Sequence, residues 1–142
     1  MFYRQRRQIP IYDSFYLDII VSDDTDKINK ATGSNDEEYF ACAKKASFRS
    51  TSDTGKPCWK KCITIVLNPN DEFSPMTTKV MVHEANHAKN MILERIGYKQ
   101  DAKNDEASTY FLEWIFGEIE DFYNKVMKKE ADKKSSNAGT EE

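Results

Sequence analysis

The sequence predicts an α+β domain, with a small antiparallel or mixed sheet in its N-terminal half and two long helices in its C-terminal half. Two observations support this class. Before residue 68, segments of strand-forming residues alternate with short polar turns, and after residue 74 the apolar residues recur at helical spacing. The chain has 142 residues, and 39% of them are hydrophobic, which suffices for one core. We therefore expect a single folded domain over residues 1–127.

The first part of the expected sheet is a pair of strands. Residues 9–12 and 15–22 have strand patterns, and Asp13 and Ser14 form the turn between them. The second segment is dense in aromatic and β-branched residues, which favour strands. The polar stretch that follows contains at most a short helix near residues 27–31.

Two further strands are expected before the helices. Residues 39–49 and 59–67 have strand character, and the segment 50–57 between them is rich in Ser, Thr, Asp, Gly and Pro, which is typical of a turn. The run from Ile63 to Leu67 is the strongest strand pattern in the chain. The sequence therefore predicts three or four strands, with Trp59 and Trp114 as packing residues.

The first long helix is predicted over residues 75–96. Ser74 is suited to cap its N-terminus, Pro75 to occupy its first position, and Gly97 to end it in a left-handed conformation. Apolar residues at helical spacing should face the core: Met81, Ala85, Ala88 and Ile92.

The second long helix is predicted over residues 105–129, with Asn104 or Asp105 as its cap. Its apolar stripe consists of Phe111, Ile115, Ile119, Phe122 and Val126. Residues 128–142 are polar and small, so we expect a disordered tail there.

Charge and cysteine content restrict the class of protein. With 21 basic and 24 acidic residues, the net charge is −3, which gives no broad electrostatic surface for nucleic acid, and we interpret Arg4, Arg6 and Arg7 as a solvated cluster. No apolar run is long enough for a membrane span, and the N-terminus lacks a secretion signal. Three cysteines argue against a disulfide scaffold, so we expect free thiols in a reducing cytoplasm.

The strongest functional pattern is the string His83-Glu84-Ala85-Asn86-His87, which contains both histidines of the chain. Residues at i and i+4 of a helix share a face, so the two imidazoles can bind one metal ion. Glu84 then lies beside the open coordination position, where it can take a proton from a metal-bound water. A catalytic zinc site needs one further protein ligand.

A carboxylate is the expected third ligand, because no other histidine exists and all three cysteines lie upstream in strand or turn segments. Glu106 opens the second helix, and two antiparallel helices joined by a short loop can bring it to the metal face of the first. Asp101 in the loop and Asp105, about a quarter-turn from Glu106, are the alternatives.

These residues resemble a known family. His83-Glu84-x-x-His87 followed by Asp105-Glu106-Ala107 resembles the gluzincin arrangement of zinc peptidases, and residues 78–119 are most similar to small HExxH proteins encoded by bacteriophages and prophages. A weaker similarity is to ImmA/IrrE-type repressor peptidases. The resemblance covers about a third of the chain. It implies a zincin-like fold, Zn²⁺ held by His83, His87 and Glu106, and Glu84 as general base.

The chain also departs from the larger gluzincins. Many of them carry an Asp four residues after the ligand Glu, where this chain has Tyr110, and no histidine remains for their substrate-binding role. Tyr110 lies one turn past Glu106 and could stabilise an oxyanion. A packed ring with a solvated hydroxyl is the alternative for Tyr110.

The expected activity is zinc-dependent hydrolysis of peptide bonds, as a metallopeptidase acting on a protein or peptide in the cytoplasm of a bacterial host, without a nucleic-acid or membrane partner. The alternative is a non-catalytic phage protein that keeps the zincin fold, either as a virion component or as an inhibitor of a host defence protein. A zinc-stabilised binding module is a third possibility. Substrate and oligomeric state do not follow from the sequence.

Overall fold

The computed structural model describes residues 1–10, 12, 15–36, 39–70, 75–103 and 105–140, without the side chains of residues 138–140. It confirms the α+β class, with a mixed four-stranded sheet and two long C-terminal helices. In chain order, the elements are β1 (Phe2–Gln8), β2 (Phe15–Ser22), α1 (Thr25–Thr32), β3 (Ala41–Thr51), β4 (Pro57–Leu67), α2 (Thr78–Arg95) and α3 (Glu106–Thr140).

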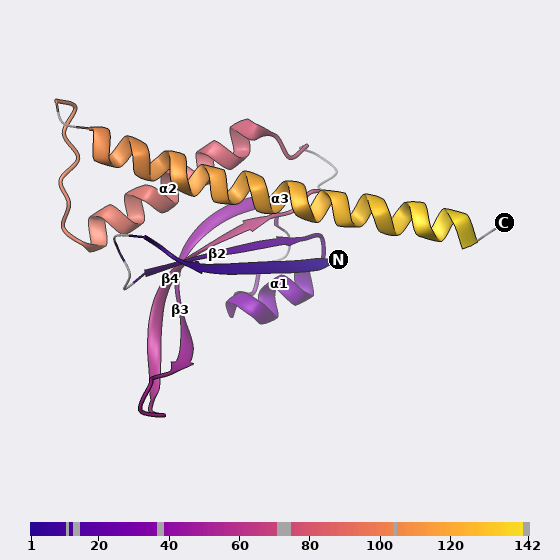
Figure 1. Ribbon diagram of the computed structural model, residues 1–142, viewed down its shortest axis with the longest axis horizontal. Helices are drawn as coiled ribbons and strands as arrows, with labels where there is room; N and C mark the ends of the chain where they lie inside the picture. Colours follow the sequence, from indigo (N-terminus) through magenta and orange to yellow (C-terminus); the bar gives the residue numbers. More distant parts are fainter. Residues whose placement is uncertain (11, 13–14, 37–38, 71–74, 104, 141–142) are drawn as a thin grey trace.

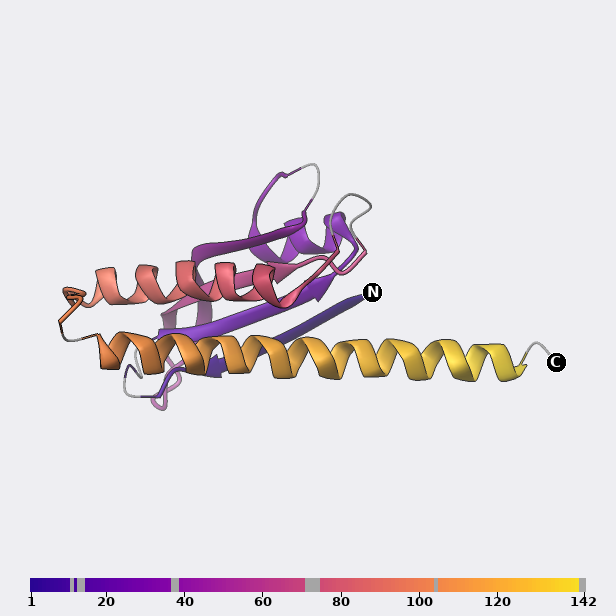
Figure 2. The ribbon, with the colours of Figure 1, turned by 90° about the horizontal axis from the view of Figure 1, so that it is seen from above.

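The sheet has the strand order β1-β2-β4-β3 (Figure 1). Its central strands β2 and β4 are parallel, because the chain crosses over through α1 and β3 between them. Both outer strands are antiparallel to their neighbours. The helices α2 and α3 run side by side in opposite directions over one face of the sheet, and α1 lies on the other face (Figures 1 and 2).

The two faces of the central strands pack into two cores. Leu17 and Ile19 of β2 and Ile63 and Ile65 of β4 pack in the core that contains the buried residues of α2 and α3. The smaller core on the α1 side is formed by Ile20, Ile28, Tyr39 and Val66. The predicted core residues of both long helices are all buried. Because helices cover both faces of the sheet, β2 and residues 62–67 of β4 are mostly apolar.

The first strand differs from the expectation. β1 is formed by residues 2–8, whereas the sequence predicted a strand at 9–12 and a solvated arginine cluster before it. Pairing with β2 places Arg4 beside the fully buried carboxylate of Asp18, so a polar segment is held in the sheet by an ion pair. The predicted turn at Asp13 and Ser14 lies outside the described residues.

The ends of α2 are capped at both sides. Thr77 is the N-cap, and its side chain accepts a hydrogen bond from the amide of Val80, so the helix begins three residues later than predicted. Ser74, the expected cap, lies outside the described residues. At the other end Gly97 has φ 75° and donates to the carbonyl of Glu94, while Tyr98 donates to Leu93. This Schellman motif confirms Gly97 as the glycine that ends the helix.

α3 continues to Thr140, whereas the sequence predicted an end near residue 129 and a disordered tail. Residues 131–137 are exposed, and residues 128–134 include four Lys, one Glu and one Ala, which favour helix without tertiary packing. Tyr3 of β1 contacts this part of the helix, because its hydroxyl donates to Glu130 at 2.8 Å and the centre of its ring lies 5.3 Å from the ammonium of Lys133. The C-terminal end of the helix projects past the sheet (Figure 2).

Residues 47–61 form a two-stranded ribbon that projects from the sheet, here called the β3–β4 arm (Figure 1). β2 pairs with β4 only from Lys61 onward, so the earlier part of β4 has β3 as its sheet partner. A turn over residues 52–56 closes the arm, with Gly55 at φ 81°. Trp59 on the arm is 71% exposed, so its expected packing role was wrong.

Among the described helices, none is long and apolar enough to cross a bilayer. The three cysteines, Cys42, Cys58 and Cys62, are free thiols on β3 and β4.

Candidate metal centre

His83 and His87 form a close pair on an exposed side of α2. Their Nε2 atoms lie 3.0 Å apart, and the two rings are nearly perpendicular. A tetrahedral zinc ion with usual bond lengths separates two imidazole nitrogens by roughly 3.3 Å. The pair would therefore need to open by only a few tenths of an ångström, roughly, to occupy two positions of such an ion.

Glu84 lies between the exposed histidine side of α2 and its buried face. The residue is 6% exposed, and it lines a shallow pocket of about 330 Å³ together with Phe40, Lys79, Val80 and His83. The carboxyl group and one imidazole of the pair therefore border the same pocket, which lies between α2 and the start of β3.

The packing of α2 explains this placement. Ala85 and Ala88 are fully buried, and their small side chains let the helix lie close to β3 and β4. Successive residues are separated by about 100° around a helix, so Glu84 lies at the edge of the surface where α2 packs against the sheet. The histidines at positions one residue before and three after it stay on the solvent side.

Two opposing effects act on the Glu84 carboxyl group. Burial raises its pKa above the ordinary value, and positive charge on His83 or His87 acts in the lowering direction. The net direction is upward. Burial also raises the pKa of the Cys42 thiol on β3, and the negative charge of Glu84 adds to this rise. A carboxyl group with a raised pKa is a suitable proton acceptor near neutral pH.

Glu106, the expected third ligand, is not brought to the histidine pair. It is exposed at the first position of α3, and about 12 Å of helix separates His87 from Arg95 before the connection 96–105 begins. Within the part of the chain that the structure describes, no three His, Cys, Asp or Glu side chains are grouped so that they could hold a metal ion. The structure thus brings the two imidazoles together, and the metal ion and its third ligand stay predictions.

The other expected site residues also lie apart from the pair. Asp101 is exposed in the connection, where its side chain accepts a hydrogen bond from the amide of Lys103, and Asp105 is exposed before α3. Tyr110 is 66% exposed and lines a separate pocket of about 300 Å³, with Pro10 and Tyr12 from the β1–β2 connection. Its role towards an oxyanion stays a prediction.

Sequence reasoning did not find Phe40 and Lys79 as neighbours of the site. Lys79 is an ordinary polar residue in the first turn of α2. Phe40 reaches the pocket only because β3 is the sheet strand over which α2 begins, and the strand order is not visible in the local sequence.

Comparison with known proteins gives no match to a family model, to a curated protein or to a solved structure. The resemblance to phage-encoded HExxH proteins therefore rests on the motif residues alone.

Proposed function

We propose that this protein is a zinc-dependent hydrolase of peptide bonds, in which His83 and His87 are metal ligands and Glu84 is the general base. The observation that carries the proposal is the pair of imidazole nitrogens 3.0 Å apart at a pocket that also contains the buried carboxyl group of Glu84. The two candidate ligands, a candidate proton acceptor and a pocket are thus adjacent, which supports the proposal.

In the proposed reaction, the metal ion and the side chains of the protein have different roles. A bound zinc ion would lower the pKa of its water and polarise the peptide carbonyl. With such an ion bound, Glu84 would accept the proton from that water and pass it to the leaving amine. Burial raises the pKa of Glu84 above its ordinary value, which is the direction that favours both transfers. Phe40 and Val80 give the pocket an apolar wall that limits competing solvent.

The third ligand in this proposal is Glu106, as the gluzincin resemblance implies. The connection 96–105 and the first turn of α3 would have to move towards the histidine side of α2 for this carboxylate to bind the same ion. Metal binding and ordering of this region would then be coupled.

The test uses untagged protein, so that the only histidines are His83 and His87. Elemental analysis should give about one zinc per chain, and His83→Ala should remove it. Cleavage of a fluorogenic peptide library should be lost in Glu84→Gln, although its zinc content stays that of the wild type. Glu94→Gln, an exposed change on the same helix, is the matched control. Unchanged zinc content in His83→Ala would refute the site.

A second candidate is a non-catalytic phage protein that retains the metal-binding helix. The observation that favours it is that no three-ligand cluster is formed among the described residues. If Glu84→Gln keeps full biological function while His83→Ala loses it, the metal is structural and this second candidate is correct.

A further inference from the structure

The β3–β4 arm and the strand residues leading into it concentrate positive charge. Residues 44–61 contain six basic residues and one acidic residue, Asp53, in a chain whose net charge is −3. The basic residues are Lys44, Lys45, Arg49, Lys56, Lys60 and Lys61. The rest of the chain is therefore strongly acidic, and the overall composition conceals a local basic surface.

Most of this charge is available to a partner. Lys44 is bound to Asp36 at 2.9 Å and to Ser34. The other five basic side chains have no ion pair within the described part of the chain. A cluster of unpaired cations on a projecting ribbon is complementary to a polyanion.

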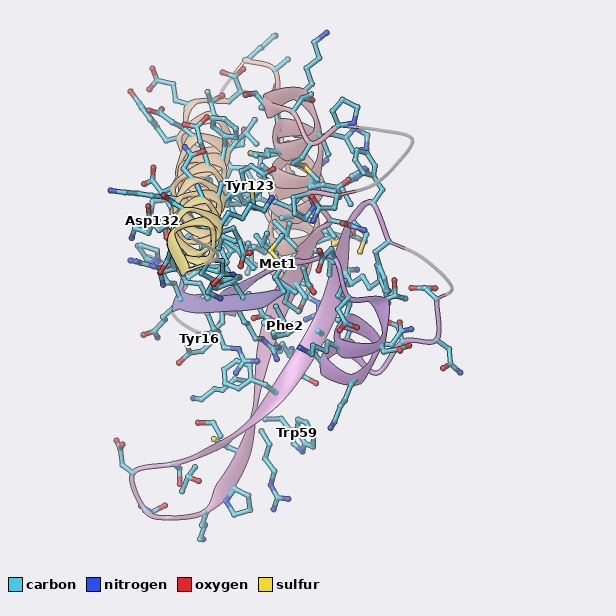
Figure 3. The ribbon with its side chains drawn as sticks, turned by 90° about the vertical axis from the view of Figure 1, so that its right-hand side faces the viewer. Met1, Phe2, Tyr16, Trp59, Tyr123 and Asp132 are labelled. Carbon is cyan, nitrogen blue, oxygen red and sulfur yellow. The ribbon has the colours of Figure 1, made fainter. Side chains whose placement is uncertain are left out.

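Trp59 lies in the middle of this surface. Its indole is 71% exposed, and Figure 3 shows it on the arm, away from α2 and α3. Arg49 is its direct partner across the strand pair, and Lys61 lies two residues along β4 on the same face. Lys45 shares this face with Arg49 on β3. The exposed aromatic ring thus lies opposite a guanidinium group, and two lysines follow further along the same face.

The opposite face fixes the base of the arm. Phe48 packs edge-on against Tyr16 of β2, with ring centroids 5.1 Å apart. The guanidinium of Arg6 from β1 lies 3.8 Å from the centre of the same Phe48 ring. Because β1 and β2 hold the arm through these contacts, the Trp59 face is presented in a defined orientation, which lowers the entropic cost of binding.

We infer that the Trp59 face of the β3–β4 arm binds single-stranded nucleic acid. A base stacks on the indole of Trp59, and the flanking phosphates are bound by Arg49, Lys61 and Lys45. Stacking requires an unpaired base, which favours a single strand over a duplex. A membrane surface is disfavoured because the neighbours of Trp59 on this face are small, polar or charged, and no second large apolar side chain is available for insertion. The inference is independent of the metal centre.

The experiment titrates the full-length protein with fluorescently labelled oligothymidylate and oligouridylate in 50 mM salt, and measures polarisation and tryptophan quenching. Trp59→Ala should weaken binding about 10- to 100-fold, whereas Trp59→Phe should retain part of the affinity. Three phosphate contacts give a slope of roughly −2 for log K against log salt, and the double change Arg49→Ala/Lys61→Ala should make it less steep by about 1.4. Lys125→Ala/Lys128→Ala, exposed cations on α3, is the matched control and should leave binding unchanged.

Several results would overturn the inference. These are no binding at 50 mM salt, binding that Trp59→Ala leaves intact, or tighter binding of a duplex of equal length. Two further contradicting results are Trp59-dependent binding to phosphatidylglycerol vesicles in place of the oligonucleotide, and Trp59-dependent self-association measured by sedimentation. Circular dichroism and a thermal melt of each variant establish that it is folded, which the exposure of Trp59 leads us to expect.

Discussion

Arg4 donates two hydrogen bonds to the carboxylate of Asp18, at 2.8 and 2.7 Å, across the pair of strands β1 and β2. Asp18 is fully buried and also accepts a hydrogen bond from the hydroxyl of Thr64 on β4, at 3.0 Å. One carboxylate therefore joins three neighbouring strands, and it needs its cation because an unpaired buried charge is costly.

We predict that Arg4→Met destabilises the protein by about 3 kcal/mol, because it leaves the buried carboxylate of Asp18 without its bidentate partner. Urea denaturation of the purified variant measures this change. The matched control is Arg7→Met on the same strand, whose ion pair with Glu118 is at the surface and should contribute less than about 1 kcal/mol. Equal losses in the two variants would contradict the structural role of Asp18.

Substitution by alanine should lower the stability of the protein at Gly97 and raise it at Gly117. Gly97 has φ 75°, so Gly97→Ala should cost about 1 kcal/mol through backbone strain alone, since an added Cβ meets no atom within 4 Å. Gly117 lies inside α3 and has the same free space, so Gly117→Ala should stabilise the protein by about 0.5–1 kcal/mol. Thermal denaturation of both variants checks the signs, and a stabilising Gly97→Ala would exclude the Schellman end of α2.

In metal-free protein, Glu84→Gln should raise stability at neutral pH. Burial raises the pKa of Glu84 above its ordinary value of 4.5, so at pH values between the two the folded state holds a proton that the unfolded state has released. Stability is therefore lost as the pH rises from about 4.5 through the raised pKa, and Gln removes this loss. Melting temperatures at pH 8 should favour the variant.

At pH 4, below the ordinary value, both states carry a protonated carboxyl group and the difference between wild type and Glu84→Gln should vanish. Glu94→Gln, exposed on the same helix, should match the wild type at both pH values. A gain that is the same at pH 4 and pH 8 would show that packing, rather than ionisation, is responsible.

The third metal ligand can be identified by comparing carboxylates. If Glu106 completes the site, Glu106→Gln should weaken zinc affinity well over tenfold, and Asp101→Asn should have little effect. Competition titration with a chromogenic chelator measures both affinities. A larger loss of zinc affinity in Asp101→Asn than in Glu106→Gln would place the third ligand in the connection between α2 and α3. Equally small losses in both variants would mean that His83 and His87 are the only ligands among the residues tested.

The positions of side chains that follow a regular helical spacing could be predicted from the sequence. The apolar stripe of α3 and the core face of α2 are buried as expected, and the glycine at the end of α2 has the expected left-handed conformation. The histidine pair follows from the same helical geometry, since a separation of four residues fixes its relative placement before any tertiary contact forms.

Features that depend on distant partners were not predictable. β1 is polar, and its place in the sheet depends on Asp18, which lies 14 residues after Arg4. The placement of Glu106 depends on how the connection 96–105 packs, which no local pattern describes. Trp59 lies in a strand whose later residues are buried, so nothing in its own neighbourhood distinguished an exposed indole from a packed one.

The division of the chain into an early sheet and late helices has a consequence for biosynthesis. The four strands that the structure describes lie before residue 68, and the helices that cover one face of the sheet lie after residue 77. Until α2 and α3 leave the ribosome, Leu17, Ile19, Ile63 and Ile65 of the nascent sheet have no cover on that face. Such a surface promotes aggregation and chaperone binding. A nascent chain stalled after β4 should therefore bind chaperones or aggregate. Once α3 has left the ribosome, the apolar face is covered and the chain should no longer do so.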